Sequence, residues 1–112
     1  HSLSNAALDS GWPKALTLAR RLEAWLEADR HGEPEALLQA LADERTYPDA
    51  SLPDTGIGLE RERWLSSAFI RGRDYGTRAS TVGMLGHDCE GIVVERRWGP
   101  EGVALGERRI VF

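Results

Sequence analysis

Residues 78–98 read RASTVGMLGHDCEGIVVERRW, and this stretch decides the fold. Two runs that favour extended structure, 78–85 and 92–98, flank the polar connection GHDCEG at 86–91. The second run alternates with the period of a strand that has two different faces. One face carries Ile92, Val94 and Arg96, and the other carries Val93, Glu95 and Arg97. The stretch therefore predicts an antiparallel β-hairpin.

Strands are expected on both sides of this hairpin, and helices before them. A second connection at 99–106 leads to a last predicted strand at 107–112, and a short strand is predicted at 68–71. Near the N-terminus, apolar residues at helical spacing predict a helix from Pro13 to about residue 30 and a second one from about Pro34. Helices followed by a β-meander predict an α+β fold, with the helices packed on one face of an antiparallel sheet.

The chain is expected to form a single domain over residues 1–112, with three kinds of segment. Residues 13–45 are helical in pattern, and residues 46–58 form a loop rich in proline, glycine and aspartate. A short helical turn is expected at 59–65, and residues 68–112 are rich in β-structure. Such a small sheet has open edges and one uncovered face, so we expect more chain or a partner to complete it, and a homodimer to form.

Composition excludes several classes of protein. With 112 residues, of which 41% are hydrophobic, the chain can bury a core. A net charge of −4 without a dense basic patch excludes nucleic acid as a partner. No apolar run approaches the length of a membrane span, of roughly 18 to 20 residues. We therefore expect a soluble, cytoplasmic protein, and the dominance of arginine over its single lysine, Lys14, is typical of GC-rich bacterial genomes.

No residue pattern points to a metal or another cofactor, and we expect none. The three histidines, His1, His31 and His87, are widely separated in the sequence, and no phosphate-binding loop is present. The single cysteine, Cys89, excludes an internal disulfide and stands between Asp88 and Glu90, which disfavour its thiolate. Cys89 is therefore a poor nucleophile.

The most unusual stretch is YGTRAST at 75–81. It places Arg78 at the start of a strand, three residues after an aromatic side chain and among small hydroxyl residues. A guanidinium there could hold a carboxylate or orient a nucleophile. The structural alternative, that Arg78 binds loop carbonyls, is equally consistent with the spacing.

Four segments together resemble one protein family. They are residues 3–14 (LSNAALDSGWPK), 52–58 (LPDTGIG), 69–82 (FIRGRDYGTRASTV) and 93–98 (VVERRW). In this order they are similar to the NRDE family, which includes Transport and Golgi organisation protein 2. Members of this family are generally about twice as long. The resemblance therefore implies a C-terminal portion, and the missing N-terminal half, with its Asn-Arg-Asp-Glu motif and early cysteine, becomes the expected partner.

The resemblance further implies half of an αββα N-terminal-nucleophile hydrolase fold and an amidohydrolase that acts on an amide or peptide-like bond of an unidentified small molecule. The family in turn resembles more distant hydrolases. By that resemblance, Asn5 is expected to stabilise an oxyanion and Arg78 to steady the nucleophile. Trp12, Tyr75 and Thr77 are expected to bind the substrate. The structural alternatives are a turn contact for Asn5 and packing roles for Trp12 and Tyr75. Because the nucleophile would lie in the missing half, the chain alone is expected to be inactive.

Two other functions stay open at this point. The chain could belong to a non-enzymatic binding or trafficking module that handles a lipid or haem, in which case the pocket should be apolar. It could also be an interaction domain that stands alone. A cysteine at the second position of the longer protein would favour the enzyme, and its absence would favour the binding module.

Overall fold

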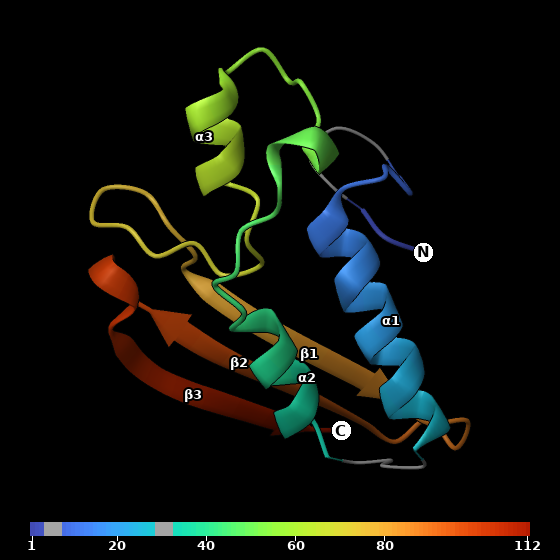
Figure 1. Ribbon diagram of the computed structural model, residues 1–112. Helices are drawn as coiled ribbons and strands as arrows, with labels where there is room; N and C mark the ends of the chain where they lie inside the picture. Colours follow the sequence, from blue (N-terminus) through green and yellow to red (C-terminus); the bar gives the residue numbers. More distant parts are fainter. Residues whose placement is uncertain (4–7, 29–32) are drawn as a thin grey trace.

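The computed structural model describes residues 1–3, 8–28 and 33–112, which form helices on one side of a small sheet (Figure 1). The elements are α1 (Pro13–Glu27), α2 (Glu35–Leu41), η1 (Asp49–Ser51), α3 (Leu59–Trp64), β1 (Ala79–Leu85), β2 (Gly91–Trp98), η2 (Pro100–Gly102) and β3 (Ala104–Val111). The predicted α+β class is confirmed, as are the helical start at Pro13 and the helical turn near residue 59.

The sheet is an antiparallel meander in the order β1-β2-β3, with the predicted hairpin at its centre. Val82 faces Val94, and Val94 in turn faces Arg109, so these three residues share one face. β3 begins earlier than predicted because η2 shortens the connection. Within it, Gly99 donates its N–H to the Val103 carbonyl at 2.8 Å, and Gly102 takes a positive φ of 67°.

The strand predicted at 68–71 is wrong, and hydrogen bonding explains why. The N–H of Phe69 binds the carbonyl of Asp43 at 2.8 Å, and the N–H of Ile70 binds the hydroxyl of Thr77 at 2.9 Å. These donors are therefore satisfied by a loop and a side chain rather than by a neighbouring strand. The segment is still buried, since Phe69 is only 3% exposed and its ring meets Trp98 edge-on at 5.1 Å.

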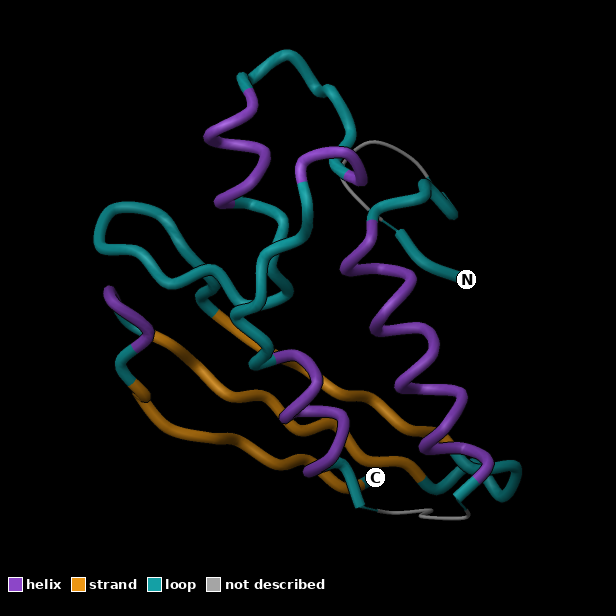
Figure 2. The backbone as a smooth tube through the Cα atoms, in the orientation of Figure 1, coloured by secondary structure: helices purple, strands orange, loops and turns teal. Residues whose placement is uncertain are grey.

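The core lies between α2 and one face of the sheet. Leu38 on α2 packs against Val82 and Val94, and all three are buried. The tube view shows α2 across the sheet and α1 beside it (Figure 2). Arg96 strengthens this packing, because it binds Glu35 of α2 at 2.5 Å and Glu107 of β3 at 2.7 Å. The sheet is thus tied to a helix by both apolar and ionic contacts.

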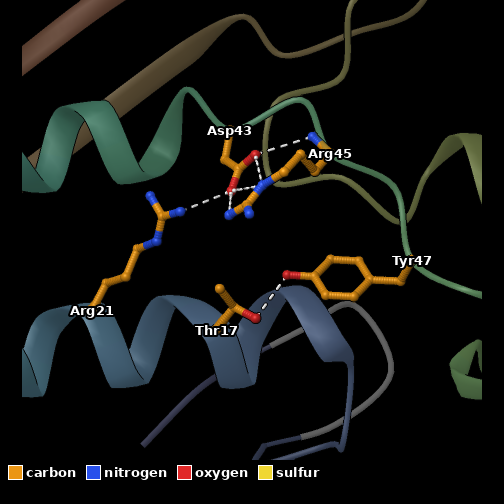
Figure 3. Close-up of polar contacts among 5 residues, drawn as sticks. All are labelled: Thr17, Arg21, Asp43, Arg45 and Tyr47. Carbon is orange, nitrogen blue, oxygen red and sulfur yellow. Dashed lines mark hydrogen bonds and ion pairs between the residues drawn. The ribbon is translucent and has the colours of Figure 1, made fainter.

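Polar contacts join α1 to the segment that follows α2 (Figure 3). Arg21 of α1 donates to the Asp43 carboxylate at 3.1 Å, and Arg45 donates to the same group at distances down to 2.6 Å. One turn earlier on α1, Thr17 accepts the Tyr47 hydroxyl at 2.7 Å. The Arg45 hydrogen bond lowers the pKa of Asp43 from its ordinary 3.8 to about 2, and Arg21 acts in the same direction.

This lowered pKa predicts an acid-sensitive fold. A depressed folded-state pKa gives stability that is present above the ordinary pKa and is lost as the pH falls through the folded one. Unfolding free energy should therefore decline between about pH 4 and about pH 2, and Asp43→Asn should reduce that decline. Denaturant titrations across this range measure it, with exposed Asp74→Asn as the matched control. An identical acid profile for wild type and Asp43→Asn would contradict the prediction.

Candidate functional site

A cavity of about 520 Å³ is lined by residues from the start of α1, from α3 and from the segments around them. Its wall comes from four parts of the chain: the N-terminal segment with α1, the loop before α3, α3 itself, and the segment leading to β1. The apolar and aromatic lining consists of Leu3, Trp12, Ala15, Leu18, Ile57, Leu65, Ala68, Ile70 and Tyr75. Three polar residues complete it: Lys14, Thr55 and Glu62.

Lys14 fixes the first turn of α1 to the segment after α3. Its Nζ donates to the carbonyl of Leu65 at 2.7 Å and to that of Ser67 at 3.3 Å, and it lies 5.2 Å from the centre of the Trp12 ring. Both acceptors are neutral, and Lys14 forms no ion pair with a carboxylate of the described residues. Burial lowers the pKa of Lys14 from its ordinary 10.5, because desolvation penalises the ammonium.

Glu62 fixes the loop before α3. Its side chain is 2% exposed, and its Oε1 accepts hydrogen bonds from the N–H of Thr55 at 2.7 Å and from the Thr55 hydroxyl. Within the part of the chain that the structure describes, its Oε2 is buried without a hydrogen-bond partner. Glu62 therefore holds Thr55, and with it the loop that carries Ile57, in the wall of the cavity.

Two glycines place Tyr75 at the cavity. A Cβ on Gly72 would lie 2.2 Å from the Tyr75 carbonyl oxygen, and one on Gly76 would lie 2.6 Å from that of Ile70, so neither position accepts a side chain without a shift of backbone. The N–H of Thr77 donates to the Ile70 carbonyl at 2.9 Å, which closes the loop. Tyr75 then lies against Trp64, with ring centres 5.7 Å apart.

Comparison with known proteins identifies the family. The model of the family described as Transport and Golgi organisation 2 matches residues 1–100. The chain belongs to this family. No curated protein and no solved structure gives a significant match to this Transport and Golgi organisation 2 family member.

The predicted site residues of this family member lie in different places. Trp12 and Tyr75 line the cavity. Thr77 does not line it, but forms hydrogen bonds with the backbone of Ile70, which does. Arg78 is exposed, donates to the Gly99 carbonyl at 3.2 Å and is absent from the lining. Asn5 lies outside the described residues. The catalytic roles of Asn5 and Arg78 therefore stay predictions.

The sequence reasoning missed Lys14, Thr55 and Glu62. Lys14 is the only lysine among many arginines, and Thr55 lies within the LPDTGIG stretch, so both carried a signal. Glu62 carried none, because its neighbours Glu60, Arg61 and Arg63 make the helix look solvated throughout.

The described chain has no group of three or more metal-ligating side chains, and Cys89 is free and exposed in the β1–β2 turn. None of its helices is both long and apolar enough to cross a membrane.

The tie between Glu62 and Thr55 can be tested by Thr55→Val. This change keeps the shape of the side chain but removes a hydrogen bond to a buried carboxylate, so it should lower the unfolding free energy by about 1–3 kcal/mol. Thr81→Val is the matched control, because the Thr81 hydroxyl makes only an exposed contact with Glu95. Denaturant unfolding measures the loss of unfolding free energy in both variants. Equal losses would show that the Thr55–Glu62 hydrogen bond does not stabilise the fold more than an exposed contact does.

Proposed function

We propose that the cavity binds an amphipathic acyl molecule, whose carboxylate or carbonyl oxygen accepts a hydrogen bond from Lys14. The observation that carries this proposal is the pairing of Lys14. An ammonium has three N–H donors, and only two neutral carbonyls of the described residues accept from it. Its charge is therefore not neutralised by the described residues, although it is half-buried in the wall of a largely apolar cavity.

The rest of the wall suits the apolar part of such a ligand. Leu65 and Ile70 supply aliphatic surface, and Trp12 and Tyr75 supply aromatic surface. Small-molecule sites typically combine a mostly apolar wall with a few polar groups that fix orientation. The proposed function is therefore ligand binding within a Transport and Golgi organisation 2 family protein, which corresponds to the lipid-handling alternative.

Amide hydrolysis is the second proposal, and it uses the same donor. An amide carbonyl placed at Lys14 would be polarised by the ammonium, which favours attack on its carbon. The attacking group would come from outside the described lining, because the Thr55 hydroxyl already donates to Glu62 and no cysteine or serine lines the described part of the cavity. The implied partner is the N-terminal half of a longer family protein, and the expected cytoplasmic location stays a prediction.

The binding proposal predicts a difference between two ligands of equal length. Decanoate should bind more tightly than decanol, because only the carboxylate can pair with Lys14. Lys14→Met should weaken decanoate binding about tenfold or more and should affect decanol binding much less. Isothermal titration calorimetry measures both ligands, and Arg20→Met on the exposed side of α1 is the control. Equal binding of decanoate by wild type and Lys14→Met would overturn the proposal.

The hydrolysis proposal predicts that the 112-residue chain alone does not cleave amides. Decanoyl p-nitroanilide should be bound but not turned over, which release of p-nitroaniline measures directly. Turnover by this chain that is lost in Asn5→Ala would contradict the expectation and would place the catalytic machinery within these residues.

A further inference from the structure

The outer edge of β3 offers an unpaired strand. In the described sheet, β3 has β2 on one side and no strand on the other. Every residue of β3 from Ala104 to Val111 is exposed. Such an edge is a template for another strand unless it is covered or blocked. β3 holds no proline, and its only marked irregularity is the register shift opposite Arg97 and Trp98, near its beginning.

The hydrogen-bond pattern shows which backbone groups face outward. Gly91 and Phe112 exchange both of their backbone hydrogen bonds, at 2.7 and 3.0 Å. Bonded and non-bonded pairs alternate along an antiparallel ladder. With the observed register, Arg108 and Ile110 therefore point their N–H and C=O groups toward β2. Glu107, Arg109 and Val111 point theirs away from the sheet.

We propose that β3 pairs antiparallel with β3 of a second copy of this chain, about a two-fold axis at Arg108. This register sets Glu107 of each copy opposite Arg109 of the other. Both residues have outward backbone groups, so each such pair forms a reciprocal hydrogen-bonded pair. Both also lie on the same face of the sheet, as opposed residues in a continuous antiparallel sheet must.

The charges of this edge favour the same register. Glu107 is already positioned by Arg96 at 2.7 Å, whereas Arg109 forms no ion pair with a described residue. Opposite charges on facing strands stabilise a sheet, and like charges destabilise it. An axis at Glu107 would set Glu107 against itself, and an axis at Arg109 would set Arg109 against itself. Neither of those registers gains an opposite-charge pair.

The proposed register has one unfavourable contact, which provides a test. Arg108 meets Arg108 of the second copy at the axis, on the face opposite α2. Glu95 is the cross-strand neighbour of each Arg108 and moderates their repulsion. The other edge of the sheet lacks such complementarity, because the outward positions of β1 are Ala79, Thr81, Gly83 and Leu85.

Sedimentation velocity of the 112-residue chain over a concentration series tests the proposal. Wild type should show a monomer–dimer equilibrium. Arg109→Glu turns both attractive pairs into repulsive ones and should raise the dissociation constant about tenfold or more. Glu107→Arg combined with Arg109→Glu recreates the pairs in reverse and should restore most of the association. Arg108→Thr should tighten the dimer by removing the repulsion at the axis.

Two controls separate pairing at this edge from other effects. Arg20→Glu makes the same charge change on the exposed side of α1 and should leave the equilibrium unchanged. Circular dichroism melts establish that each variant is folded. A chain that stays monomeric at its highest soluble concentration would overturn the proposal. The β3 edge would then be available for pairing with a strand of a different polypeptide. A dimer that is indifferent to Arg109→Glu would overturn the proposal as well.

Discussion

The position of Asp43 is the constraint on which the arrangement of the helices depends. Its carboxylate binds Arg21 of α1, and its carbonyl accepts the N–H of Phe69, so one residue joins a helix to the segment that leads into the sheet. α1 needs this contact, because Leu16, Leu22 and Leu26 remain exposed along it and apolar packing alone anchors it weakly. An ionic anchor of this kind is directional, and together with the Lys14 and Tyr47–Thr17 contacts it orients α1 relative to the rest of the molecule.

The cavity follows from that constraint. Its wall comes from segments distant in sequence, so it exists only where α1, α3 and the segment leading to β1 are held together. Lys14 and the Tyr47–Thr17 hydrogen bond act at the same end of α1 as the cavity. Lys14 thus has two effects, because the contacts that hold α1 in place also bury the ammonium that we propose as the ligand's anchor. Lys14 and Glu62, the charged groups of the site, therefore hold the cavity wall together whether or not a ligand is bound.

Local patterns predicted much of the fold and little of the site. The alternation in residues 92–98 depends only on neighbours along the chain, so it predicted the hairpin and the face occupied by Val94 correctly. The strand expected at 68–71 failed because its hydrogen bonds go to Asp43 and Thr77, which no local pattern reveals. Glu62 was missed for the same reason. A glutamate among other charged residues looks exposed, and only the loop that Thr55 brings over it makes it buried.

The cavity and the outer edge of β3 lie in separate parts of the molecule, so ligand binding and strand pairing should be independent in energy. No described residue of the cavity wall belongs to a strand, whereas the proposed pairing involves β3 alone. Sites that share no residues and no common contact generally contribute additively. Ligand binding at Lys14 should therefore leave the association of β3 unchanged. Arg96 links Glu107 at this edge to Glu35 on α2, and α2 packs against α1, but none of these three residues lines the cavity.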